Sequence, residues 1–186
     1  MMNKKYSEKA AFKVVNGMLD YCRRHEKREL LQYSWIDSEG RQCALNGYIA
    51  FRLASPLEGL PEMPDGETPI DLARVFPRLD GLRELQTPDA AEVAALIAYD
   101  RQHDSRRRYM YSFGPGLPVV NSLYLRDMLT VYPDARFYFS NIISPVLVIS
   151  EHGDGVILPI RVATDEMQQR REIIYNLSTF AQRFAA

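Results

Sequence analysis

The chain has 186 residues and a mass of 21.4 kDa, which suits one domain, and its 46% hydrophobic residues are enough for an ordinary core. The 23 basic and 24 acidic side chains give a formal net charge of −1, which argues against indiscriminate nucleic-acid binding. No stretch approaches the ~20 apolar residues of a membrane span, and residues 1–6 run into an amphipathic pattern rather than an apolar signal segment, so we expect a cytoplasmic protein.

The first predicted unit is a helix followed by a hairpin. Apolar residues recur at helical spacing from Ser7, which is placed to cap the helix, to about His25. Two runs rich in aromatic and β-branched residues follow, at 30–36 and 44–53, and the residues between them, 37–40, have the composition of a turn. We therefore expect these two runs to pair as antiparallel strands.

Residues 56–69 form an irregular crossover in this interpretation, because four prolines and two glycines interrupt any regular structure there. A short apolar piece at 70–76 follows. Thr87, with proline next to it, marks the start of a helix that ends near His103. The charged run 100–108 is expected to be a solvated loop, with a local nucleic-acid contact as the alternative.

One helix followed by three antiparallel strands is the best-supported unit, over residues 117–163. A strand at 108–113 precedes it, and Asn121 and Ser122 can cap the helix, which ends near residue 132. Three strand signals without a helix between them then follow, at 135–140, 145–151 and 155–163. The separators are too short for a crossover helix, so neighbouring strands must be antiparallel.

The last segment, 165–184, is predicted to be an amphipathic helix. Its apolar residues share one face: Met167, Ile173, Ile174, Leu177, Phe180 and Phe184. Something must cover that face. Packing on this chain's own sheet is one candidate, and self-association through this helix or through an open sheet edge is another.

Motifs of catalysis are missing from the sequence. There is no Gly-rich phosphate loop, no nucleophile elbow and no His-Glu-x-x-His or Cys-x-x-Cys spacing. The three histidines lie far apart in the chain, and we interpret His152 and Asp154 as turn residues, too few to hold a metal. Cys22 and Cys43 lack paired spacing and are expected to be buried, reduced thiols. We expect no catalytic residue, no cofactor and no metal site.

The order of strand, helix and three strands over 117–163 resembles the C-terminal domain of the bacterial DNA polymerase III sliding clamp, the β subunit. The matching segments are 120–129, 135–139, 144–149 and 156–162. The stretch Leu158-Pro159-Ile160-Arg161-Val162 is the most specific, because clamps close on a similar apolar-Pro-apolar-Arg-apolar strand. Residues 7–53 are similar in layout to the other half of a clamp domain.

This resemblance implies an α+β fold, a single DNA-clamp-like domain over 1–186 made of two helix-plus-antiparallel-strand repeats with an extra C-terminal helix. Its parts are a first repeat at about 7–55, the crossover at 56–69, a second repeat at about 70–163 and the C-terminal helix at 165–184. Clamp rings are built from three such domains per subunit, whereas this chain has the length of one.

The resemblance also implies a non-enzymatic protein-interaction module associated with DNA replication. In clamps the C-terminal strand borders an apolar pocket that receives short peptides of replication proteins. Val156 and Leu158 are therefore expected to edge a partner-binding groove. The helix at 165–184 either covers that groove or packs on the sheet as core.

Clamp helices face DNA, so the cations of the two matching helices are the candidate nucleic-acid contacts. They are Lys9, Lys13, Arg23, Arg24 and Arg126. Because phosphate-driven affinity grows with the number of cations, we expect weak DNA contact at best. Since a fold does not fix a function, an enzyme or small-ligand-binding protein on the same scaffold is the alternative.

Overall fold

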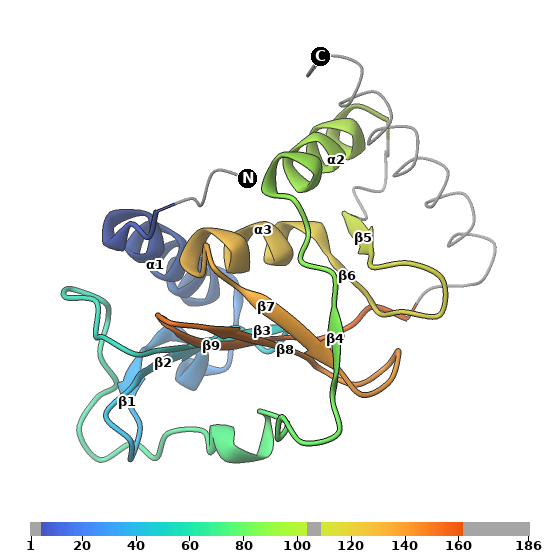
Figure 1. The fold of residues 1–186 in the computed structure, drawn as a ribbon. Coiled ribbons are helices and arrows are strands. Elements are labelled where there is room, and N and C mark those ends of the chain that lie inside the picture. The colour runs from blue at the N-terminus through green and yellow to red at the C-terminus, as the bar shows by residue number, and fades with distance from the viewer. Residues whose placement is uncertain (1–4, 104–108, 162–186) are drawn as a thin grey trace.

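The computed structural model describes residues 5–103 and 109–161 (Figure 1). It has an α+β architecture in which helices lie over one face of an antiparallel sheet. The second half of the charged run, 104–108, and the predicted C-terminal helix, 165–184, lie outside the described residues. No helix in the described part is long and apolar enough to cross a bilayer.

Local caps explain where the three α-helices begin. The side chain of Ser7 caps α1 (Glu8–His25) and that of Asn121 caps α3 (Ser122–Val131), as the sequence predicts. The middle helix, α2 (Ala90–His103), begins later than expected from Thr87 and its proline. The reason is Asp89, whose Oδ1 accepts the first free backbone amides of α2 at 2.7 and 3.1 Å.

The main sheet has seven strands in the order β1-β2-β3-β9-β8-β7-β4, and every neighbouring pair is antiparallel. Its strands are β1 (Trp35–Ile36), β2 (Gln42–Leu45), β3 (Ile49–Leu53), β4 (Arg83–Leu85), β7 (Arg136–Phe139), β8 (Val146–Ser150) and β9 (Gly153–Ile157). A separate pair consists of β5 (Met110–Ser112) and β6 (Val119–Asn121). The middle strand, β9, joins the N-terminal strands to the C-terminal ones.

The N-terminal hairpin differs from the prediction in two ways. The first three residues of the run 30–36 belong to a 3-10 helix, Glu29–Gln32, and only its last two residues, β1, form a strand. The run 44–53 is two strands, because Gly47 adopts φ 88° and Asn46 Oδ1 accepts two backbone amides of the turn at 2.9 and 3.0 Å. The expected single strand was therefore wrong, and the Asn-Gly pair turns the chain back on itself.

The crossover 56–69 holds no helix and no regular strand, and one isolated bridge ties Glu62 to Ser34. The apolar piece 70–76 contains a 3-10 helix, Leu72–Arg74. The three residues of β4 were not predicted, because so short a strand shows no alternation in the sequence. The division of the chain into one domain with two repeats stays a prediction.

The helix-and-three-strand unit is confirmed as far as Ile157. The last strand was expected to continue to 163, but β9 ends at Ile157 and residues 158–161 are not part of a strand; residues 162 and 163 lie outside the described part of the chain. The amide of Leu158 donates to the carbonyl oxygen of Tyr48 at 2.8 Å, and that of Ile160 to Val119 of β6 at 2.7 Å. This segment ties the main sheet to the β5–β6 pair.

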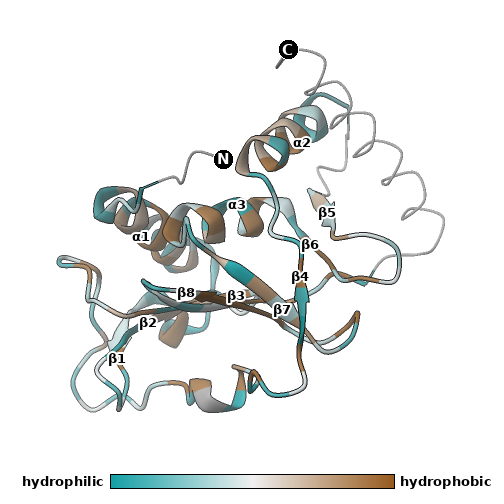
Figure 2. Ribbon diagram, in the orientation of Figure 1, coloured by the Kyte–Doolittle hydropathy of each residue, from teal (hydrophilic) through white to brown (hydrophobic). Residues whose placement is uncertain are grey.

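Both faces of the sheet are buried. The helices cover one face, where Phe51 and Phe137 are fully enclosed. The crossover and the apolar piece 70–76 cover the other, where Leu72 and Phe76 pack with Val156 (Figure 1). Figure 2 shows the apolar residues concentrated in the central strands and on the helix faces turned toward them. The ends of the strands are therefore where side chains remain open to partners.

Candidate functional site

Four connections between strands lie at the same end of the main sheet. The register places Ile49 of β3 and Val146 of β8 on either side of Ile157 in β9. Phe139 of β7 is likewise level with the first residue of β4. The β2–β3 turn, the β7–β8 loop, the chain that leaves β9 and the approach to β4 consequently all lie at the same end.

Exposed apolar side chains gather there. Within the described residues, seven large apolar or aromatic side chains are exposed, and five of them lie in these connections: Tyr48, Leu79, Ile142, Ile143 and Leu158. We call the surface of Tyr48, Ile142, Ile143 and Leu158 the apolar end. Exposed apolar side chains that gather in one place are typical of interaction sites.

Short hydrogen-bonded turns hold these side chains outward. Asn141 Oδ1 accepts the amides of Ile143 and Ser144 at 3.0 Å each, which fixes the β7–β8 loop. The ring of Tyr48 stacks on that of Tyr124 in α3, with centroids 6.2 Å apart and planes 16° from parallel. The surface is thus built on turns that the sheet positions, rather than on a long free loop.

A groove of about 680 Å³ between α1 and α3 continues this surface. Met18 and Tyr21 line it from α1, Tyr124 lines it from α3, and Phe51 of β3 lies beneath. Burial raises the pKa of Tyr124, while a hydrogen bond with Asn46 lowers it in part, so the phenol is protonated at neutral pH. The groove offers an apolar floor with polar walls.

The two residues predicted to edge a partner groove, Val156 and Leu158, differ in their exposure to solvent. Leu158 is exposed on the apolar end, whereas Val156 is 1% exposed and packs under the crossover. Their roles in binding stay predictions. Tyr48, Ile142 and Ile143 had no place among the predicted site residues, because only the register shows that they lie at the same end as Leu158.

The five candidate nucleic-acid contacts are also spread out. Lys13 of α1 and Arg126 of α3 both line the groove. Arg126 is paired with Asp127 at 2.7 Å, and at the far end of α1 Arg23 is paired with Asp20 at 3.1 Å. Lys9 and Arg24 are exposed on α1. DNA contact stays a prediction.

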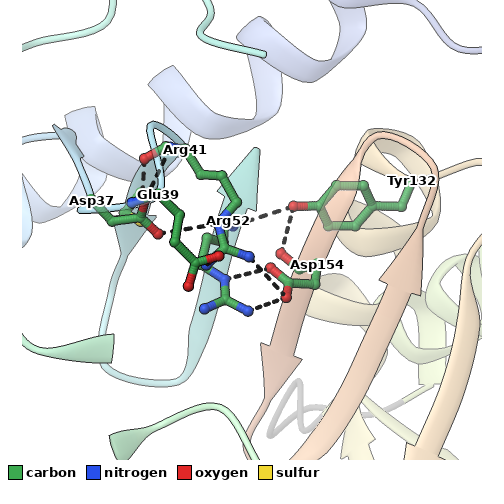
Figure 3. Close-up of polar contacts among 7 residues, drawn as sticks. Asp37, Glu39, Arg41, Arg52, Tyr132 and Asp154 are labelled. Carbon is green, nitrogen blue, oxygen red and sulfur yellow. Dashed lines mark hydrogen bonds and ion pairs between the residues drawn. The ribbon is translucent and has the colours of Figure 1, made fainter. Parts of the chain in front are cut away.

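An ion network lies on the opposite, crossover-covered face of the sheet (Figure 3). Asp154 accepts from Arg52 Nε at 2.6 Å and lies 3.7 Å from Arg41 Nη1. The Tyr132 hydroxyl donates to the backbone oxygen of Asp154 at 2.7 Å, and the Arg52 guanidinium lies over the Phe76 ring at 4.3 Å. The interpretation of Asp154 as a turn residue was wrong: it belongs to β9 and ties that strand to β3.

Ser150, Asp134 and His152 meet at the β8–β9 turn, but Ser150 Oγ donates directly to Asp134, and the imidazole stacks on Tyr6 instead of lying between them. Among residues 5–103 and 109–161, no three His, Cys, Asp or Glu side chains are placed to share a metal ion.

The predicted burial of the cysteines is confirmed, since Cys22 and Cys43 are both 0% exposed. Burial raises the pKa of the Cys43 thiol to about 12, with nearby carboxylates adding to the effect and two arginines opposing it. A thiol with so high a pKa is a poor nucleophile at neutral pH.

Comparison with known proteins confirms the fold. No protein-family model matches the sequence, and neither does any curated protein. A structure of the C. crescentus β sliding clamp aligns with a TM-score of 0.58 and 15% identity, over 83% of this chain and 64% of the clamp. A second, of Caulobacter crescentus DNA polymerase III β, gives 0.55 and 17%, over 82% and 63%. The alignments span less than two thirds of those clamp chains. The chain has the sliding-clamp fold, and at these identities the likeness establishes the fold alone.

Proposed function

We propose that this chain, built on the sliding-clamp fold, is a non-enzymatic protein-interaction module whose apolar end binds a short peptide segment of a partner. The observation that carries the proposal is the exposure of Tyr48, Ile142, Ile143 and Leu158 at one end of the sheet. Preformed surfaces of this kind bind with little loss of conformational entropy, and aromatic anchors supply much of the affinity.

The chemistry of the surface favours a peptide with large apolar or aromatic side chains. The stacked rings of Tyr48 and Tyr124 offer a flat anchor, and the two isoleucines offer aliphatic contact beside it. A surface this small suits binding in the micromolar range, about −8 kcal/mol.

Because the fold is that of sliding clamps, we propose replication proteins as the first class of partner to test. The similar structures are β subunits of DNA polymerase III, and one of them has polyethylene glycol bound at a region proposed to tether the β-motif. By analogy with these structures, we propose that this chain binds a protein of the replication machinery and contacts DNA weakly at best. Clamp-binding peptides of replication proteins are therefore the first ligands to test.

The test is a fluorescence-anisotropy titration of such peptides against the full chain and against a chain that ends at Ala163. Ile143→Asp and Leu158→Asp should each weaken binding at least tenfold, because a buried charge opposes apolar contact. Ile36→Asp is the matched control, since Ile36 is 53% exposed on β1, away from the apolar end. No binding by either chain, or equal losses in all three variants, would refute the proposal.

The groove between α1 and α3 favours a second candidate, the binding of a small ligand. Its volume of about 680 Å³ and its mixed walls are typical of ligand sites. A thermal-shift screen of metabolites with the full chain and with Gly17→Trp, which fills the groove, would test it. Stabilisation of the native chain alone supports a ligand site, and equal behaviour of the two chains ends this alternative.

A further inference from the structure

We propose that the groove between α1 and α3 binds a small aromatic monoanion, with its rings beside the tyrosines at one end and its charge beside Lys13 at the other. The inference names a ligand class for the second candidate function, the small-ligand site, and rests on that function. The two helices lie side by side over the same face of the sheet (Figure 1). The groove between them, of about 680 Å³, is within the size range of sites that bind small ligands.

A glycine keeps the middle of this groove open. Gly17 lies near the centre of α1, a helix of 18 residues, and lines the groove. A Cβ built on it would meet nothing within 4 Å, so no neighbouring group requires a glycine there. In a helix interior glycine is about 1 kcal/mol less favourable than alanine. The sequence thus carries a helix-weakening residue at a point where a side chain would occupy the groove.

Aromatic rings gather at one end of the groove. Tyr21 and Tyr124 line it, and the ring of Tyr48 stacks on that of Tyr124 at 6.2 Å. Burial is the main cause of the raised pKa of Tyr124, and the phenols of Tyr48 and Tyr21 add to it because they lie close by. Tyr21 is 57% exposed, so its ring is open to a ligand. Since aromatic rings attract one another beyond the area that they bury, this end favours a flat aromatic group.

The charged side chains that line the groove leave one positive charge in excess. They are Lys13, Arg126 and Asp127. Arg126 Nη2 lies 2.7 Å from the Asp127 carboxylate, and these two charges cancel. Lys13 is exposed and forms no ion pair within residues 5–103 and 109–161. Two cations and one anion therefore sum to +1, which complements a ligand with a single negative charge.

The spacing along α1 allows one ligand to contact both ends. Lys13 and Tyr21 are eight residues apart, about 12 Å along the helix axis, and helix positions with this spacing share a face. The lysine stem is flexible, so its ammonium can turn toward the middle of the groove. A two-ring aromatic molecule with one carboxylate can therefore lie on the tyrosines and reach the ammonium across Gly17.

Isothermal titration calorimetry of the full chain with two matched probes tests the inference. Naphthoate carries a carboxylate, and naphthamide carries a neutral amide on the same two rings. We expect naphthoate to bind about tenfold more tightly, because a charge-assisted contact with a partly exposed ammonium adds modestly to the affinity. Equal binding of the two probes would overturn the inference, and so would the absence of naphthoate binding.

Three variants of α1 locate the site. Lys13→Gln should lower the affinity for naphthoate about tenfold and leave that for naphthamide unchanged. Lys9→Gln is the matched control and should change neither affinity, because Lys9 is exposed on α1 but does not line the groove. Gly17→Trp should remove the binding of both probes, and a native-like thermal unfolding curve shows that this variant is folded. Equal losses of naphthoate binding in the two lysine variants would overturn the inference.

The outcomes separate this inference from the proposed functions. If both probes bind equally and Gly17→Trp abolishes their binding, the small-ligand candidate is supported and the assignment of an anion is refuted. Ile143→Asp, at the apolar end, should bind naphthoate as the native chain does. Loss of naphthoate binding in this variant alone would place the probe on the peptide surface and overturn the inference. Lys13→Gln should bind a clamp-binding peptide like the native chain, and peptide binding by no variant would refute the peptide function alone.

Discussion

Replacing Asp154 by alanine should destabilise the protein through the charge that it leaves behind. Asp154 and Arg52 are 15% and 16% exposed, and they join the two strands that hold the N-terminal and C-terminal parts of the sheet together (Figure 3). Removing one member of a fully buried pair costs about 3–5 kcal/mol, because the partner keeps its charge without a counter-ion.

The expected cost here is smaller, about 2–3 kcal/mol, because the pair retains some contact with water and Arg52 keeps other partners. Its guanidinium still lies over the Phe76 ring, a contact worth about 0.5–1 kcal/mol. Replacing both members at once, by Asp154→Leu with Arg52→Met, should cost less than Asp154→Ala alone, since no charge is then left unpaired.

Urea unfolding, followed by circular dichroism and by the fluorescence of Trp35, measures these differences. Glu84→Ala is the matched control, because its ion pair with Arg136 is more than half exposed and water screens it, so its loss should change the stability little. If Asp154→Ala costs no more than Glu84→Ala, or if the double replacement costs more than the single one, the reasoning is refuted.

Three further predictions concern packing, thiol reactivity and acid. Gly155→Ala should cost about 1–3 kcal/mol in urea unfolding, since its Cβ would lie 2.7 Å from Met128, whereas Gly17→Ala, with open space around its Cβ, should stabilise α1 by about 1 kcal/mol. A destabilising Gly17→Ala together with a neutral Gly155→Ala would contradict this packing. Cys43, with its pKa raised to about 12 by burial, should react with a disulfide reagent at pH 8 only after urea is added, and immediate reaction would disprove its burial. Burial alone would raise the pKa of Asp37, but the backbone amides of the β1–β2 turn and a neighbouring arginine lower it overall, so its stabilising contribution is present above the ordinary aspartate pKa and is lost as pH falls through the lowered one. The urea concentration at the unfolding midpoint should therefore fall as the pH is lowered below about 4. The fall should be smaller in Asp37→Asn, which has no carboxylate at this position to protonate.

Elements with a strong local signal were predicted from the sequence. The apolar spacing and the caps at Ser7 and Asn121 specify α1 and α3, and the short separators after α3 specify the antiparallel meander. Elements set by tertiary pairing were not. The three residues of β4 become a strand only because β7 is beside them, and the turn at Asn46 and Gly47 is easily absorbed into a longer apolar run.

The candidate site was predicted only where it coincides with the clamp-like terminal stretch. Leu158 was found in this way, but Tyr48 and Ile143 come from other parts of the chain and meet it only through the strand register. The ion pair of Arg52 and Asp154 joins residues 102 positions apart, and no local pattern marks either one. The pairing register of strands that lie far apart in the chain cannot be predicted from a single sequence.

The position of β9 has a consequence for synthesis. Of the strands in the main sheet, β9 is the last to leave the ribosome, yet it occupies the middle of the order β1-β2-β3-β9-β8-β7-β4. Until it emerges, the nascent chain holds two separate three-stranded pieces, whose facing edges are the largely apolar strands β3 and β8. Such edges readily pair with other chains. A nascent chain whose β8 has left the ribosome while β9 is still inside it would therefore display this protein in its most aggregation-prone form.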